Sequence, residues 1–169
     1  MTTIWPRRRR KRWQSDSVIE LDVQYGLDDE NDGEPPPSQC LIEHWVKAAL
    51  HGRREVAELA VRIVGTDEIR QLNRTYRHKD VPTNVLSFPF DAPPGVDLPM
   101  LGDIAIAAPV VQTEAVEQGK DVEAHWAHMV VHGVLHLLGY DHIVDNEAQV
   151  MERLEIEVLA GLGYPNPYL

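Results

Sequence analysis

Residues 131–142 read VHGVLHLLGYDH and place His132 and His136 four residues apart within an apolar run. On a helix, side chains at this spacing project from one face about one turn apart, as in two-histidine metal sites. Gly139 stands where a left-handed residue would end the helix, so the chain can bring His142 back over the same face. Three imidazoles and one open position are typical of a catalytic zinc rather than a structural one. We therefore expect His132, His136 and His142 to bind a metal ion.

The three histidines have the spacing of the metzincin peptidases, with one difference that matters for the chemistry. Where metzincins carry a glutamate directly after the first histidine as general base, this chain has Gly133, which cannot accept a proton. The pattern disfavours peptide hydrolysis and leaves other metal-assisted hydrolysis open. The alternative is that the histidines lie in a core or on a polar face, but three at ligand spacing around a glycine favour a metal site.

Two further histidines, His125 and His128, lie on the same helical stripe as His132 and His136. They could contact the metal ligands and orient them. For His128 the favoured interpretation is a hydrogen-bonded core histidine, ahead of a residue that orients a ligand and of a ligand itself.

Charge is distributed unevenly along the 169 residues. The formal net charge is −11, although residues 7–12 (RRRRKR) supply six of the 16 basic side chains. The other ten basic residues are outnumbered by 27 acidic ones, which argues against a general nucleic-acid clamp. A polyanion would have to bind at a local basic patch.

The length suits one domain with a core of its own. Cys40 is the only cysteine, which excludes an internal disulfide and a cysteine zinc cluster and fits a reducing cytoplasm. No apolar run follows the basic N-terminus as in a signal peptide, and none reaches the roughly 18 residues of a membrane span. We expect a cytoplasmic protein without a membrane partner.

Residues 1–16 are expected to form a flexible basic arm, and residues 17–169 a folded domain. Trp5 and Trp13 flank the basic run and could stack on bases while the arginines contact phosphates. The favoured alternative is a solvated tail without a specific role.

Hydrophobic periodicity predicts alternating strands and helices. Thr66 and the pair Asn146 and Gln149 are expected to cap two of the helices. The proline-rich stretch 91–100 is predicted to be a loop that could lie over a cleft. The order suggests a sheet with helices packed on it, and the metal site is expected on the helix at the centre of the domain. Strands are expected at 18–25, 56–64, 84–88 and 101–107, and helices at 39–50, 66–76, 109–119, 122–138 and 146–163.

Two motifs carry a resemblance to a known family, HGVLHLLGYDH at residues 132–142 and YRHKDVPTNVLSFPF at residues 76–90, supported by LGDI at residues 101–104. With them the chain resembles the bacterial YbeY endoribonucleases of ribosomal RNA maturation. The resemblance covers roughly Val18 to the C-terminus, and the arginine-rich arm departs from it. It implies a single α+β domain with a small mixed four-stranded sheet, about five or six helices, and one zinc ion on His132, His136 and His142.

The resemblance also implies a function. The expected activity is zinc-dependent cleavage of single-stranded RNA, with a part in maturing the 3′ end of small-subunit ribosomal RNA and in ribosome quality control. The small ribosomal subunit and an assembly GTPase are the partners that the family suggests. Other divalent transition metals could replace zinc, because histidine ligands accept several of them.

The family's functional arginine falls on Arg77, whose guanidinium could hold phosphate oxygens and stabilise charge on the cleaved phosphodiester. The sequence alone instead favours a salt bridge between Arg77 and Asp80. Asp141 is a candidate proton acceptor if its side chain faces the metal, and a turn former otherwise. The remaining candidates for lining the cleft are Asn84, Ser87 and Asp103, for which a hydrogen-bonding role in the sheet is an equal alternative.

Two other functions are compatible with the motifs. One is a metzincin-like peptidase or other hydrolase, against which Gly133 and the cytoplasmic expectation count. The other is a non-catalytic ribosome assembly factor in which zinc only stabilises the last helix. In that case Arg77→Ala would leave the cellular role intact.

Overall fold

A computed structural model describes residues 4–6, 18–27, 34–141 and 145–169, and within them four strands and five helices form. The α+β class, the mixed four-stranded sheet and the number of helices agree with the sequence-based expectation. In chain order the elements are β1 (Val18–Gly26), α1 (Gln39–Leu50), β2 (Val56–Val64), α2 (Thr66–Arg77), β3 (Val85–Pro89), β4 (Met100–Ala107), α3 (Ala108–Glu117), α4 (Val122–Leu137) and α5 (Asp145–Gly161).

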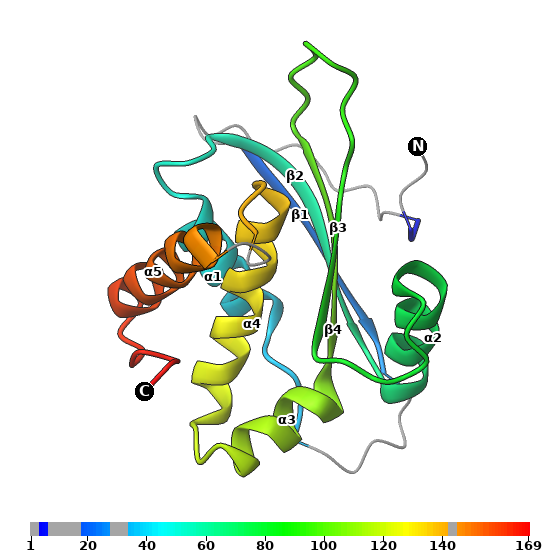
Figure 1. Cartoon of the computed structure of the whole chain (residues 1–169), viewed down its shortest axis with the longest axis vertical. Coiled ribbons are helices and arrows are strands. Elements are labelled where there is room, and N and C mark those ends of the chain that lie inside the picture. The colour runs from blue at the N-terminus through cyan, green and yellow to red at the C-terminus, as the bar shows by residue number, and fades with distance from the viewer. Residues whose placement is uncertain (1–3, 7–17, 28–33, 142–144) are drawn as a thin grey trace.

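The sheet has the strand order β1-β2-β4-β3. β1 and β4 both run parallel to β2, whereas β3 runs antiparallel to β4. The parallel pairs require crossover connections, which α1 and α2 contribute to, and the antiparallel pair needs only the loop at residues 90–99. This loop protrudes beyond the sheet as the tip of a hairpin (Figure 1).

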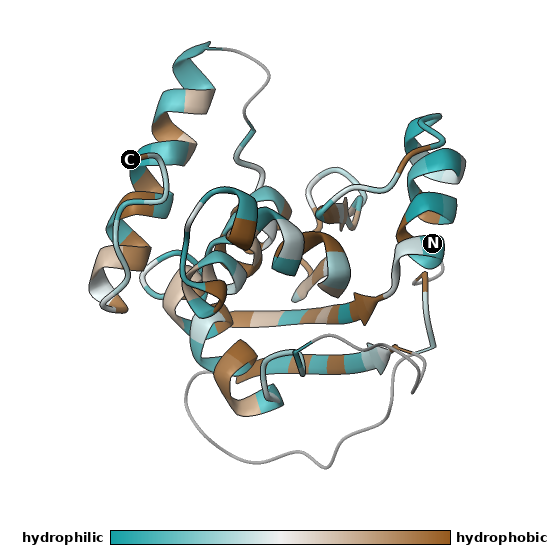
Figure 2. Cartoon of the chain, turned by 90° about the horizontal axis from the view of Figure 1, so that it is seen from below, coloured by the Kyte–Doolittle hydropathy of each residue, from teal (hydrophilic) through white to brown (hydrophobic). Residues whose placement is uncertain are grey.

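The larger core lies between the sheet and α1, α4 and α5, which occupy one side of it (Figure 1). Hydrophobic and hydrophilic positions alternate along the strands, as Figure 2 shows, because successive side chains point to opposite faces. The apolar residues of α4 are buried nearly all round, as the sequence predicts for a central helix. Trp45 of α1 and Trp126 of α4 are the largest side chains in this core.

The opposite face of the sheet carries α2 and a short piece of the N-terminal arm. Asp22 and Asp103 are buried on this face, one on each side of Ala60 in the register. The backbone N–H of Ile4 donates to Oδ2 of Asp103 at 3.1 Å, and the ring of Trp5 stacks on Arg62. Residues 4–6 of the arm are therefore packed against the domain. The arginine-rich run and Trp13 lie outside the described residues.

Element boundaries follow the sequence-based prediction closely, but the predicted caps do not. Thr66 is the first residue of α2, and Gly65 is its N-cap without a side-chain hydrogen bond. Asn146 lies inside α5, which begins one residue earlier. The predicted caps are thus the first residue of α2 and the second residue of α5, since helix ends are set by local backbone geometry more than by residue type. Among the described residues, no helix is long and apolar enough to cross a membrane.

Candidate metal and RNA-cleavage site

Four histidines form a row along α4. The ring centroids of His125 and His128 are 6.3 Å apart, those of His128 and His132 are 6.1 Å apart, and those of His132 and His136 are 4.7 Å apart. Each pair meets edge to face. The spacing of three, four and four residues therefore places all four imidazoles on one stripe, as predicted.

His132 and His136 are the closest pair in the row, and both are half-buried. The helix ends just beyond them, where Gly139 adopts a φ of 97° and the N–H of Tyr140 bonds to the carbonyl of Leu135 at 3.1 Å. This reversal is the left-handed helix end that the sequence predicts. Residue His142 lies outside the described residues, so its place as third ligand stays a prediction.

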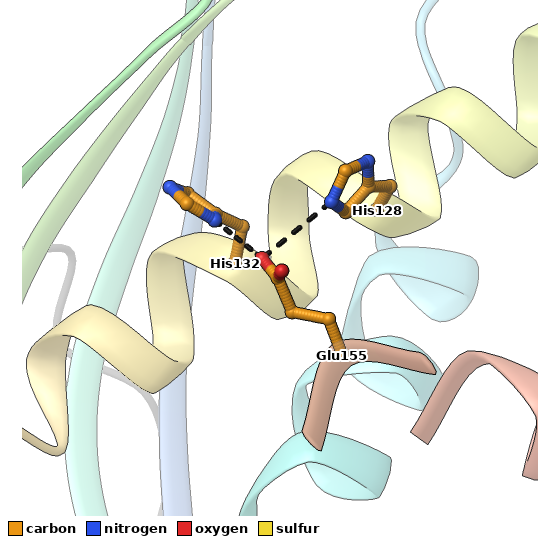
Figure 3. A group of neighbouring side chains, drawn as sticks. All are labelled: His128, His132 and Glu155. Carbon is orange, nitrogen blue, oxygen red and sulfur yellow. Dashed lines mark hydrogen bonds and ion pairs between the residues drawn. The ribbon is translucent and has the colours of Figure 1, made fainter. Parts of the chain in front are cut away.

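Glu155, on α5, is a residue of the site that the sequence analysis missed. Its side chain is fully buried, one carboxylate oxygen is hydrogen-bonded to Nδ1 of His132, and the other accepts from the hydroxyl of Tyr168. Nε2 of His128 lies 3.5 Å from the oxygen that binds His132, which is too long for a strong hydrogen bond (Figure 3). A carboxylate four residues after buried Met151 was the available signal.

The buried carboxyl of Glu155 is held in its charged form. Burial is the largest single effect and raises its pKa. The contacts with His128, His132 and the hydroxyl of Tyr168 together outweigh burial and lower the pKa to about 2. Burial and the carboxylate together raise the pKa of Tyr168, which keeps its hydroxyl protonated as a donor. A negative charge thus lies beside the histidine row at neutral pH, where it favours a cation.

His128, His132 and Glu155 form a group that could itself hold a metal ion, since one ligand atom from each lies within 4.8 Å of the others (Figure 3). Both ring nitrogens of His128 are buried without a hydrogen-bond partner among the described residues. This group overlaps the predicted ligand set at His132. The donor atoms of both sets, imidazole nitrogens with a carboxylate nearby, fit a divalent transition metal.

Gly133, between the two histidines, faces the sheet rather than the histidine row. A Cβ at this position would come within 2.9 Å of Cγ2 and 3.1 Å of Cδ1 of Ile104 on β4. The helix therefore packs on β4 with no space for a side chain at position 133. A glutamate there, as in metzincins, would be forced into the core.

Arg77 lies at the end of α2 and reaches β3. One guanidinium nitrogen donates to the carbonyl of Ser87 at 2.8 Å, and the group lies over the ring of Phe88 at 5.4 Å. The backbone N–H of Phe90 and the carbonyl of Asn84 both form hydrogen bonds with β4 or the residue that ends it. Because the residues that bond to the neighbouring strand alternate along an antiparallel strand, the carbonyl of Ser87 points away from β4. Arg77 is therefore exposed at the outer edge of the sheet.

The salt bridge to Asp80 that the sequence favoured is made by another arginine. Both carboxylate oxygens of Asp80 accept from Arg70, at 2.9 and 3.3 Å. This bidentate pair lowers the pKa of Asp80 and raises that of Arg70. The guanidinium of Arg77 is bound to backbone carbonyls instead, at Ser87 and more weakly at Tyr76.

The other predicted residues fall in different places. The hydroxyl of Ser87 donates to the carbonyl of Gly133 at 3.4 Å, so this side chain lies beside the histidine pair. Asn84 donates to both oxygens of Glu114, at 3.1 and 3.2 Å. Asp103 points to the face of the sheet opposite α4. Asp141 is half-buried just after the helix reversal.

Glu114 links the start of β3 to the histidine row. Besides Asn84, its carboxylate binds Nε2 of buried His125 at 2.8 Å. Burial lowers the pKa of His125, and the opposite effect of Glu114 is smaller. His125 is thus held as a neutral core histidine, one turn away from His128.

Comparison with known proteins identifies the family. The fold is similar to the solution structure of TM1509 from Thermotoga maritima, with a TM-score of 0.54 and 24% sequence identity over 86% of this chain and 92% of that one. A family model described as endoribonuclease YbeY matches residues 29–163, which include both motifs and the histidine row. The chain therefore belongs to the YbeY family, which implies that it is an endoribonuclease of ribosomal RNA processing.

Proposed function

We propose that this protein is a zinc-dependent endoribonuclease that cleaves single-stranded RNA and matures the 3′ end of small-subunit ribosomal RNA. The observation that carries the proposal is the pair His132 and His136, 4.7 Å apart between ring centroids, just before the helix reversal at Gly139. The family supports the RNA substrate. The small ribosomal subunit, an assembly GTPase, ribosome quality control and the cytoplasm belong to the same proposal.

The metal ligands in this proposal are His132, His136 and His142. Nδ1 of His132 contacts Glu155, so this ring would bind a metal through Nε2. A metal ion held there supplies Lewis acidity, which lowers the pKa of a water molecule and draws charge from a phosphate group. Zinc suits such ligands, and nickel, copper or iron would also be accepted.

The overlapping group of His128, His132 and Glu155 is the competing ligand set. Two ligand atoms of a tetrahedral zinc lie about 3.3 Å apart, because each metal–ligand bond is about 2.0–2.1 Å long. Nδ1 of His132 and the nearer oxygen of Glu155 are in direct hydrogen-bond contact, which is closer than that. This contact favours Glu155 as a residue that orients the ligand His132, rather than as a metal ligand itself.

Arg77 is the proposed phosphate-binding group. The carbonyl of Ser87 and the ring of Phe88 hold its guanidinium at the edge of β3, while the hydroxyl of Ser87 bonds to Gly133 next to His132. One strand therefore connects the arginine to the metal-binding helix. A guanidinium in this place can bind two phosphate oxygens and stabilise the charge that develops during cleavage. Asp141 is the proposed proton acceptor.

The experiment combines metal analysis with RNA cleavage. We expect purified wild-type protein to hold about one metal per chain and His136→Ala to lose it, whereas His128→Ala keeps it. We expect Arg77→Ala to retain the metal and lose cleavage of a single-stranded RNA. Arg70→Ala is the matched control, since it removes an exposed arginine from the same helix, and it should cleave like the wild type.

Three outcomes would contradict the proposal. Loss of metal in His128→Ala with retention in His136→Ala would assign the metal to the group with Glu155. Equal cleavage by Arg77→Ala and wild type would remove the arginine from the reaction. Cleavage that persists in every variant would come from a contaminating nuclease and would favour a non-catalytic assembly factor.

A further inference from the structure

Glu155 connects three parts of the molecule through one buried carboxylate. It comes from α5, one oxygen contacts Nδ1 of His132 on α4, and the other accepts from Tyr168, in the segment that follows α5. Its relative exposure is 0%. Burying a charged carboxylate is costly unless it is paired and hydrogen-bonded, and both oxygens here have their own partner.

We propose that Glu155, held by Tyr168, is a positioning residue that fixes the imidazole of His132 for metal binding. This inference rests on the proposed function, because it assumes that His132 and His136 are metal ligands. A carboxylate on Nδ1 keeps the proton on that nitrogen and leaves the lone pair on Nε2. It also fixes the direction of the ring and raises the basicity of the nitrogen that binds the metal.

The segment at residues 162–169 holds the hydroxyl of Tyr168 in place. The backbone N–H of Tyr168 donates to the side chain of Asn166 at 2.9 Å, and the carbonyl of Pro167 accepts from Lys120 at 2.5 Å, just before α4. The ring of Tyr168 meets the ring of His128 edge to face, with centroids 5.5 Å apart. This segment therefore contacts the histidine row at His128, although the two are far apart in the sequence.

His128 has a related part in the arrangement. Its ring lies between Tyr168 and His132, and its Nε2 is 3.5 Å from the carboxylate oxygen that binds His132. It is buried beside Glu155, whose side chain is buried as well. Burial strengthens the hydrogen bond between Glu155 and His132.

Tyr164 offers a matched control in the same segment. Its hydroxyl donates to Glu123 at 2.7 Å and accepts from Trp45 at 3.1 Å, so it also anchors the segment to α4 and α1. Neither contact involves Glu155. Tyr164→Phe and Tyr168→Phe each remove one hydroxyl that binds a carboxylate, but only the second acts on the proposed support of His132.

The test measures zinc affinity by competition with a chromophoric chelator, together with the visible spectrum of the cobalt(II)-loaded protein. We expect Glu155→Gln to bind zinc about 10–100-fold more weakly than the wild type. We expect Tyr168→Phe to weaken binding in the same direction by a smaller factor and Tyr164→Phe to leave the affinity unchanged. The cobalt(II) spectrum should change in Glu155→Gln and not in Tyr164→Phe. Circular dichroism confirms that each variant is folded.

The outcomes separate this inference from the proposed function. If His136→Ala loses the metal but Glu155→Gln and Tyr168→Phe bind zinc as tightly as the wild type, the positioning role is wrong and the proposed function stands. If Glu155→Gln and His128→Ala lose the metal while His136→Ala keeps it, Glu155 is a ligand and both proposals fail. If Tyr164→Phe weakens zinc binding as much as Tyr168→Phe, the effect is general loosening, which also overturns the inference.

Discussion

Gly133→Ala tests why the residue between the two histidines of α4 is a glycine. The added methyl carbon would lie 2.9 Å from Cγ2 of Ile104, whereas carbon atoms in ordinary contact are about 3.5–4.0 Å apart. The helix or Ile104 must therefore shift, and overpacking of this kind costs about 1–3 kcal/mol. Alanine returns about 0.5–1 kcal/mol in a helix interior. We expect the free energy of unfolding to fall by about 1 kcal/mol.

In a protein that already carries Ile104→Ala, the same glycine substitution should have the opposite effect on stability. The three nearest atoms to the added carbon all belong to the side chain of Ile104 beyond its Cβ, so Ile104→Ala removes them. In that background we expect Gly133→Ala to stabilise the protein by about 0.5–1 kcal/mol, because only the helix preference remains. Urea unfolding of the four proteins measures the coupling. Equal stabilisation by Gly133→Ala in both backgrounds would refute the packing explanation.

Three further predictions concern residues around the site. Gly102→Ala should destabilise the protein by more than about 2 kcal/mol, measured by urea unfolding, because Gly102 has a φ of 138° and the new Cβ would lie 2.2 Å from the carbonyl oxygen of Phe88. His125 has a lowered pKa in the folded protein, so the unfolded chain binds more protons as the pH falls below the ordinary value of 6.5. The contribution of His125 to stability is complete above that pH and is lost on acidification. Between about pH 7 and pH 5, the unfolding temperature should therefore depend less on pH in His125→Gln than in the wild type. An equal pH dependence in the two proteins would contradict the assignment. Asn84→Ala should lower the unfolding free energy by about 1.5–3 kcal/mol through its bonds to Glu114 while KM for RNA stays the same in folded protein, and a raised KM would make Asn84 a substrate-binding residue.

The helices and strands were predictable because hydrophobic periodicity repeats over many residues. The ranges expected for α1 and β2 agree with the structure residue for residue. The histidine row was also predictable, since its members lie on one helix and their relative placement follows from helix geometry. Such local information includes the left-handed end of α4 at Gly139.

Contacts between distant segments could not be predicted in the same way. Glu155 lies 23 residues after His132 and Tyr168 lies 13 residues further on, and neither spacing relates them to one helix face. The pairing of Asp80 with Arg70 rather than Arg77 depends on the path of the chain after α2, where His78 takes a left-handed conformation. The sequence contains the residue types, but the partners are chosen by the tertiary fold.

The most direct test of metal-dependent RNA cleavage is a reconstitution experiment. Protein stripped with a chelator is given increasing amounts of zinc, and the rate of cleavage of a single-stranded RNA is measured with the metal bound per chain. We expect no cleavage without metal, a rate that rises with bound zinc until about one ion per chain, and no recovery in His136→Ala at any zinc concentration. Full activity of the metal-free protein, or equal recovery in His136→Ala, would contradict the assignment of this site to RNA cleavage.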